Sequence, residues 1–207
     1  NAVILVSVMM YKSLGLSDSA IAFWTGWLLL PWTLKPFFSP FLEMFSTKKV
    51  FVIATQLIAG AGFGVMAFCL PLPFRIQATL GLFFVMAFNS ATHDTAADGL
   101  YISSLDRTGQ AKYVGFQSAF WNIGQVVAQG GLVYVAGLLE ERYDIVPAWM
   151  IVWGIFAAMM GLFALYHWVL LPRGTVGKGV QSLRGVAQKN VAVAVPAVGR
   201  VVVKYTS

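Results

Sequence analysis

The chain has 207 residues, of which 58% are hydrophobic and 11% are charged, and its mean hydropathy is +0.75. Soluble proteins carry about 25% charged residues, so this composition excludes an ordinary soluble domain and indicates a membrane protein with several spans. The net charge of +6 does not indicate a nucleic-acid-binding protein, because residues 1–172 sum to zero and the excess basic residues all lie in residues 173–207.

The hydrophobic runs predict an all-α membrane protein built as a bundle of six transmembrane helices. They cover residues 1–12, 20–45, 50–70, 75–105, 113–139 and 147–171. The first run is too short to cross a bilayer, so we expect the first helix to be truncated. These runs define a predicted six-helix transmembrane domain over residues 1–172.

The basic residues predict how the domain is oriented. Loop 46–49 carries Lys48 and Lys49, loop 106–112 carries two more basic residues, and residues 173–207 carry six. The positive-inside rule places all three segments in the cytoplasm, so six spans leave both termini inside. We expect residues 173–207 to be a basic cytoplasmic tail that is poorly ordered or non-native, since its apolar stretch is too short to span.

Polar side chains lie deep in the fourth predicted span. Asp94 falls about 6 Å from the midpoint of that helix at a rise of roughly 1.5 Å per residue. An Asp at such depth costs on the order of 2.5–3.5 kcal/mol, which is typical of a residue on a transport path. On a helical wheel Asp94 and Asp98 share a face with Tyr101 between them, and Asn89 and His93 form a second pair.

Lys35 lies near the middle of the second span, at a depth similar to that of Asp94, so we expect the two charges to pair and to leave Asp98 more free. The pattern allows two interpretations. Asp94 and Asp98, with His93, carry protons during transport, or the Lys35–Asp94 pair is a fixed ion pair that holds the helices together. His93 likewise is either a proton relay or a hydrogen-bonding residue within the bundle.

A polar stripe runs along the fifth predicted span. Its four members follow a spacing of i, i+4, i+7 and i+11 and fall within a sector of about 60° on an α-helix, and they are Ser118, Asn122, Gln125 and Gln129. Such a stripe faces protein or water and not lipid. Together with the second and fourth spans it predicts a polar interior that solute crosses, with the third and sixth spans at the periphery.

These observations favour a secondary transporter over two alternatives. The first alternative is a non-transporting membrane protein or an inactive half-transporter. The second is an intramembrane enzyme that uses His93 and Asp94, and we do not expect enzymatic activity. We also predict no metal ion and no cofactor, because the chain holds two His and one Cys and three convergent ligands are not evident.

Three segments resemble known transporter sequences. SPFLEMFSTKK (residues 39–49) resembles the loop signature of the major facilitator superfamily, with Glu43, Lys48 and Lys49 in the positions of its gating charges. LPWTLKPFFSP (30–40) and NSATHDTAADGLY (89–101) resemble the second and fourth helices of AmpG-like muropeptide permeases and acetyl-CoA transporters.

This resemblance implies a fold of twelve spans in two halves, of which this chain is the amino-terminal half. It implies proton-coupled uptake (symport) of a muropeptide-like or other small polar solute by alternating access, across the bacterial inner membrane. In this fold the solute site lies between the two halves. The expected partners are therefore the lipid bilayer, a small solute, protons and a missing carboxy-terminal six-helix half.

Overall fold

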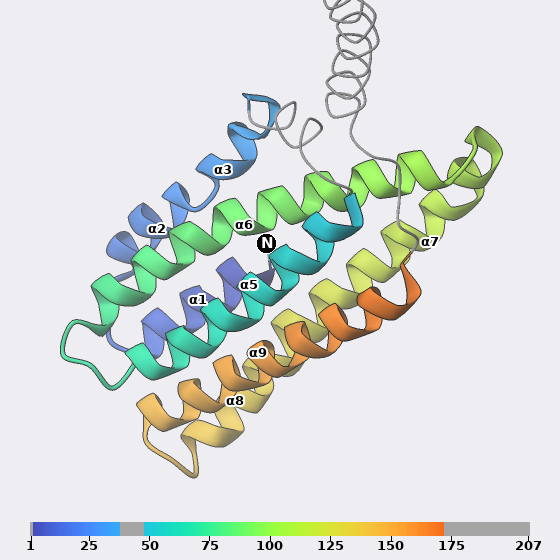
Figure 1. The fold of residues 1–207 in the computed structure, drawn as a ribbon. Coiled ribbons are helices and arrows are strands. Elements are labelled where there is room, and N and C mark those ends of the chain that lie inside the picture. Colours follow the sequence, from blue (N-terminus) through green and yellow to red (C-terminus); the bar gives the residue numbers. More distant parts are fainter. Residues whose placement is uncertain (1, 38–47, 172–207) are drawn as a thin grey trace, which may run out of the picture.

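A computed structural model describes residues 2–37 and 48–171, and in this part of the chain it contains helices and no strand (Figure 1). The elements in chain order are α1 (Ala2–Ser13), α2 (Asp18–Trp27), α3 (Leu30–Thr33), α5 (Lys48–Cys69), α6 (Arg75–Ser104), α7 (Arg107–Val126), the π-helix η1 (Val127–Gly131), α8 (Leu132–Glu140) and α9 (Ile145–Leu170). The predicted gating residue Glu43 and the predicted tail lie outside the described residues.

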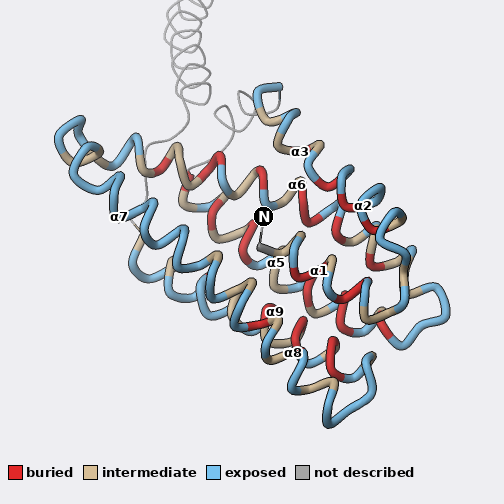
Figure 2. Tube along the Cα trace, turned by 180° about the vertical axis from the view of Figure 1, so that it is seen from behind, coloured by how far each residue is buried: buried red, intermediate tan, exposed pale blue. Residues whose placement is uncertain are grey.

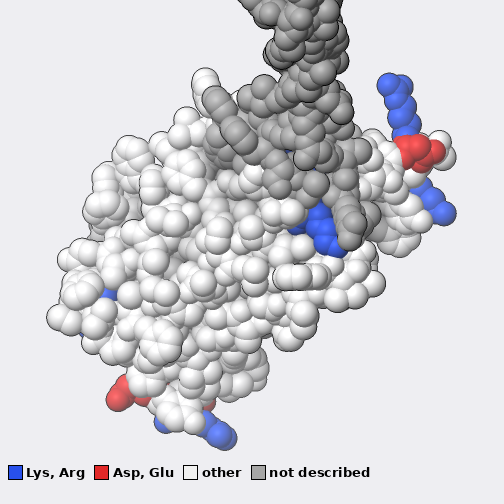
Figure 3. All heavy atoms as spheres, viewed as in Figure 1, with Lys and Arg blue, Asp and Glu red and all other residues white. Residues whose placement is uncertain are grey.

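Three stretches of the described chain are long and apolar enough to cross a membrane. They are Lys48–Cys69, Ile145–Leu170 and the composite helix Arg107–Glu140. Helix α6 has sufficient length, with 30 residues, but its second half is too polar for it to join this group. Figure 3 shows charged side chains gathered mainly at the ends of the helices, with a mostly uncharged surface between them. The protein is therefore an integral membrane protein.

The second predicted span is not one continuous helix. Helix α2 ends at Trp27, and the short helix α3 begins at Leu30 with Pro31 in its first turn. Proline has no N–H to donate to the carbonyl four residues earlier, and its ring clashes with that carbonyl. For Pro31 the affected carbonyl is that of Trp27, which is where α2 stops.

The fifth predicted span is continuous, but it contains a five-residue π-helix, Val127–Gly131, between α7 and α8. A π-helical segment inserts extra residues into a turn and is often found at functional sites. Neither the stripe nor the apolar pattern predicted it.

Helices α5, α6 and α9 form the centre of the bundle, with α5 packed against both of the others (Figure 1). A methyl group on Gly60 of α5 would lie 3.3 Å from the carbonyl oxygen of Ala157 in α9. The glycine therefore permits the close approach of these two helices. Gly64, four residues later, faces open space instead.

The core is rich in aromatic side chains. Trp149 and Trp153 of α9 are almost fully buried, and the Trp153 ring stacks on Phe63 of α5 and meets Phe83 of α6 edge to face. Aromatic pairs of this kind bury large areas and add a geometric preference of about 0.5–1.5 kcal/mol each. The cluster fixes α5, α6 and α9 relative to one another.

Helix α1 is tied to the core by hydrogen bonds between side chains. The buried phenol of Tyr11 donates to the hydroxyl oxygen of Thr79 in α6, at 3.0 Å. The indole N–H of Trp153 points to the sulfur of Met10 at 3.0 Å. Helix α1 is therefore an integral part of the bundle.

Helix α7 stands apart from this core. None of its 20 residues is buried, and it leads into α8 through the π-helix (Figures 1 and 2). In Figure 2 buried positions are seen on α1, α5, α6 and α9, whereas α7 has none and is exposed along most of its length.

Candidate functional site

A cluster of three charged side chains joins the segment after α3 to the middle of α6. Lys35 Nζ donates to Asp94 Oδ2 at 2.6 Å and lies 3.5 Å from Asp98 Oδ2. Since Asp94 and Asp98 are one helical turn apart, a single ammonium group neutralises part of the repulsion between two carboxylates. The expected pairing of Lys35 with Asp94 is present, but Asp98 is not left free, because Lys35 reaches both acids.

The charged cluster opens to the surface of the described bundle. The exposed fractions of the Lys35, Asp94 and Asp98 side chains are 26%, 52% and 49%. Ionised carboxylates do not face acyl chains, because the free energy of placing a charge in lipid is too high. This face of α6 must therefore meet water or further protein.

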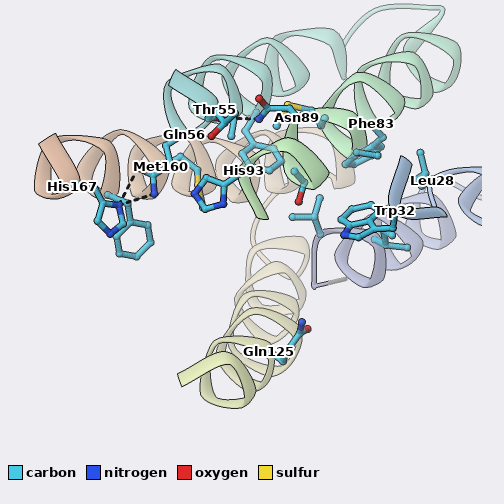
Figure 4. A pocket seen from close by; sticks show the side chains of 18 residues that line it. Leu28, Trp32, Thr55, Gln56, Phe83, Asn89, His93, Gln125, Met160 and His167 are labelled. Carbon is cyan, nitrogen blue, oxygen red and sulfur yellow. Dashed lines mark hydrogen bonds between the residues drawn. The ribbon is translucent and has the colours of Figure 1, made fainter. Parts of the chain in front are cut away.

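His93 and Asn89 lie on a different side of α6. They line a cavity of about 450 Å³ that is enclosed mainly by α5, α6 and α9, with contributions from α1, the α2–α3 region and Gln125 (Figure 4). The Asn89 amide donates to the main-chain carbonyl of Thr55 at 2.8 Å. Successive residues of an α-helix are about 100° apart, so adjacent His93 and Asp94 serve two separate environments.

The polar end of this cavity includes residues that the sequence did not single out as a site. Gln56 of α5 is buried, and its side-chain amide lies 2.8–3.0 Å from Nδ1 of His167 in α9. The third and sixth predicted spans are thus not purely peripheral. A buried glutamine in an otherwise apolar span was the signal available in the sequence, since an amide in lipid needs a partner.

The polar stripe of the fifth span does not line a single path. Asn122 donates to the main-chain carbonyl of Ser118 on its own helix at 2.8 Å, and both residues are exposed. Gln129 donates to the Gln125 side-chain oxygen at 2.5 Å. Of the four, only Gln125 reaches the main cavity, and Gln125 with Gln129 lines a smaller one beside α1.

Tyr101 and the two predicted gating lysines lie near the far end of α6. Tyr101 donates its phenol hydrogen to the main-chain carbonyl of Gln110 at 2.6 Å, bracing the turn between α6 and α7. Lys48 is 8% exposed and packs against Gly99, where a methyl group would lie 3.1 Å from Lys48 Cε.

Lys49 has a different set of partners. Its ammonium group donates to the main-chain carbonyls of Trp168 and Leu171, both at 2.7 Å. It thereby satisfies carbonyls that have no intrahelical partner at the end of α9 and places a cation at the negative end of the helix dipole.

Among the described residues, no group of three His, Cys, Asp or Glu side chains is arranged to hold a metal ion. The candidate site therefore consists of a half-exposed charged cluster and an interhelical cavity on two different sides of α6. Such an arrangement can bind and release small charged or polar species.

Comparison with known proteins gives one match. The family model of the BT1 family matches residues 2–198, nearly the whole chain. No curated protein and no solved structure matches it. The BT1 family is a transporter family related to the major facilitator superfamily, and this chain belongs to it.

Proposed function

We propose that this protein is a proton-coupled secondary transporter of a small polar solute, and that residues 1–172 form the amino-terminal six-helix half of a major facilitator fold. The observation that carries the proposal is the contact of one lysine with two acids in the middle of α6. Membership of a transporter family supports it independently.

The charged cluster supplies the chemistry of coupling. Protonation of Asp94 or Asp98 weakens the attraction to Lys35, and release of Lys35 frees an ammonium group to meet an anionic part of the solute. Proton binding to an acid therefore favours solute binding to Lys35, because the carboxylate no longer holds the ammonium group. This linkage couples the two without a covalent step.

The exposure of the charged cluster supports the proposal that a second six-helix half packs against this one. The two half-exposed carboxylates on a spanning helix must contact water or protein and not lipid. The same holds for the exposed polar side chains of Ser118 and Asn122 on α7. A carboxy-terminal six-helix half packed over this side would enclose all of them at mid-membrane. The solute would then pass between the halves as they rock.

The resemblance of residues 30–40 and 89–101 to AmpG-like permeases suggests the solute class. Muropeptides, other amino-sugar or peptide compounds, and acyl-CoA-like anions all carry charge or many hydroxyl and amide groups. We place the protein in a bacterial inner membrane, with both termini, Lys48, Lys49 and residues 173–207 on the cytoplasmic side. Proton relay by His93 and a path along Asn89, Tyr101, Gln125 and Gln129 belong to the same proposal, as does gating by Glu43, Lys48 and Lys49.

The test begins with an uptake screen of these three solute classes in proteoliposomes of the full-length protein. Asp98→Asn is then compared with Asp106→Asn, an acid-to-amide change at the exposed N-cap of α7, where Asn also accepts the cap hydrogen bond. We expect Asp98→Asn to lose uptake driven by a pH gradient and Asp106→Asn to retain it. Unchanged pH-driven uptake in Asp98→Asn removes the proton role.

A further inference from the structure

One polar atom in the interhelical cavity has no partner. Nε2 of His93 is buried, and no atom of the described residues is within hydrogen-bonding distance of it. Two of the polar side chains that line the cavity have partners of their own, since Asn89 donates to Thr55 and Gln56 pairs with His167. A buried nitrogen without a partner loses more free energy than a typical hydrogen bond gains. The site therefore favours an occupant that forms a hydrogen bond with His93 Nε2.

The rest of the cavity limits the chemistry of that occupant. Within residues 2–37 and 48–171, no Asp, Glu, Lys or Arg lines the cavity, so these residues offer a charged ligand nothing to replace its hydration. The walls are largely apolar and include the aromatic rings of Trp32, Phe63 and Phe83. Aromatic walls favour a flat aromatic ligand that stacks or packs edge to face.

The size of the cavity fits a small ligand. Its volume of about 450 Å³ lies within the range of about 300–1,000 Å³ that is usual for ligand sites. His93 and His167 also line a second, smaller cavity that reaches Tyr101. An occupant would thus lie against the aromatic walls with its polar group directed to His93.

From this geometry we infer that the cavity between α5, α6 and α9 is a binding site for a neutral, flat aromatic molecule that carries a hydroxyl group, held by a hydrogen bond to His93 Nε2. The site is separate from the charged cluster of Lys35, Asp94 and Asp98, which lies on another side of α6. It shares His93, Asn89 and Gln125 with the solute path proposed above, but the experiment below measures binding alone, so its failure would leave the proton-coupled transport undecided.

The experiment uses 2-naphthol as the probe and naphthalene as its analogue without the hydroxyl. Purified protein labelled with ¹⁵N-histidine is titrated in detergent micelles, and the His93 imidazole signal is identified as the one absent from His93→Phe. We expect 2-naphthol to shift this signal saturably. Naphthalene should bind about tenfold more weakly, because it cannot supply the missing hydrogen bond.

Two alanine variants provide a matched pair that leaves His93 in place. Ala59 of α5 lines the cavity, whereas Ala61 on the same helix is exposed. Ala59→Trp fills the cavity and is expected to abolish the saturable shift, while Ala61→Trp preserves it. Equal behaviour of the two variants, a shift that never saturates, or equal binding of both probes would overturn the inference and indicate water in the cavity or partition into detergent.

Discussion

Lys35 Nζ and Asp94 Oδ2 lie 2.6 Å apart although their residues are separated by 59 positions in the chain. The contact anchors the segment after the broken second span to the middle of α6. Because both side chains are partly exposed, screening reduces the strength of the pair, and its contribution to folding is modest. In the transport mechanism proposed above, a weak pair is one that protonation of Asp94 can break.

The first prediction concerns the energy of this pair. In a double-mutant cycle of Lys35→Met and Asp94→Asn, followed by thermal unfolding in micelles, we expect a coupling energy of about 1 kcal/mol. Lys12 and Asp18, 3.2 Å apart and more exposed, serve as the control and should show no measurable coupling. Additive effects at Lys35 and Asp94 would mean that the contact does not stabilise the fold.

The second prediction separates two roles of Lys49. Lys49→Met removes both hydrogen bonds to the end of α9 and should cost about 1 kcal/mol, whereas Lys49→Arg keeps a donor and costs less. Hydrogen exchange of the last turn of α9 should accelerate in Lys49→Met alone. Loss of transport with unchanged exchange would instead favour the gating role.

The third prediction tests the contact of α5 with α9. Gly60→Leu places a side chain against the backbone of Ala157, so we expect destabilisation by about 1–3 kcal/mol from overpacking. Gly64→Leu introduces the same residue one turn away into open space and should be tolerated. The melting temperatures of the two variants are compared, and similar values would contradict the packing described for α5.

The fourth prediction concerns the buried hydrogen bond between Tyr11 and Thr79. Tyr11→Phe removes the donor and should cost about 1 kcal/mol. Thr79→Val leaves the phenol hydroxyl buried without its partner and should cost more, up to about 3 kcal/mol. Chemical unfolding of both variants measures how far each lowers the free energy of unfolding. A larger decrease in Tyr11→Phe than in Thr79→Val would argue against a buried phenol.

Length and apolar content were sufficient to locate the main helices. The runs 50–70, 75–105 and 147–171 correspond to α5, α6 and α9 with ends that differ by no more than two residues. Short connections fix these ends, because Pro71 and Pro73 stop α5 and Asp106 caps α7. Whether six helices cross the membrane remains a prediction, since three candidate spans are found among the described residues.

Contacts between distant residues were harder to predict. The helical wheel correctly separates His93 from Asp94, but it does not tell which neighbour each one meets. Nothing in the apolar pattern of residues 147–171 indicates that His167 pairs with Gln56 and lines the cavity. Such partners depend on how α5 packs against α9, which involves side chains more than 100 positions apart. The break at Pro31 could have been read from the sequence.

The π-helix at Val127–Gly131 determines which face of α8, the helix that follows it, turns toward the core. One residue more than an α-helix would hold rotates everything that follows by about 100°. Leu132 and Ala136, which follow the π-helix, are buried in the core. An α-helix without the extra residue would turn both side chains by the same angle, away from the face that is buried in this structure.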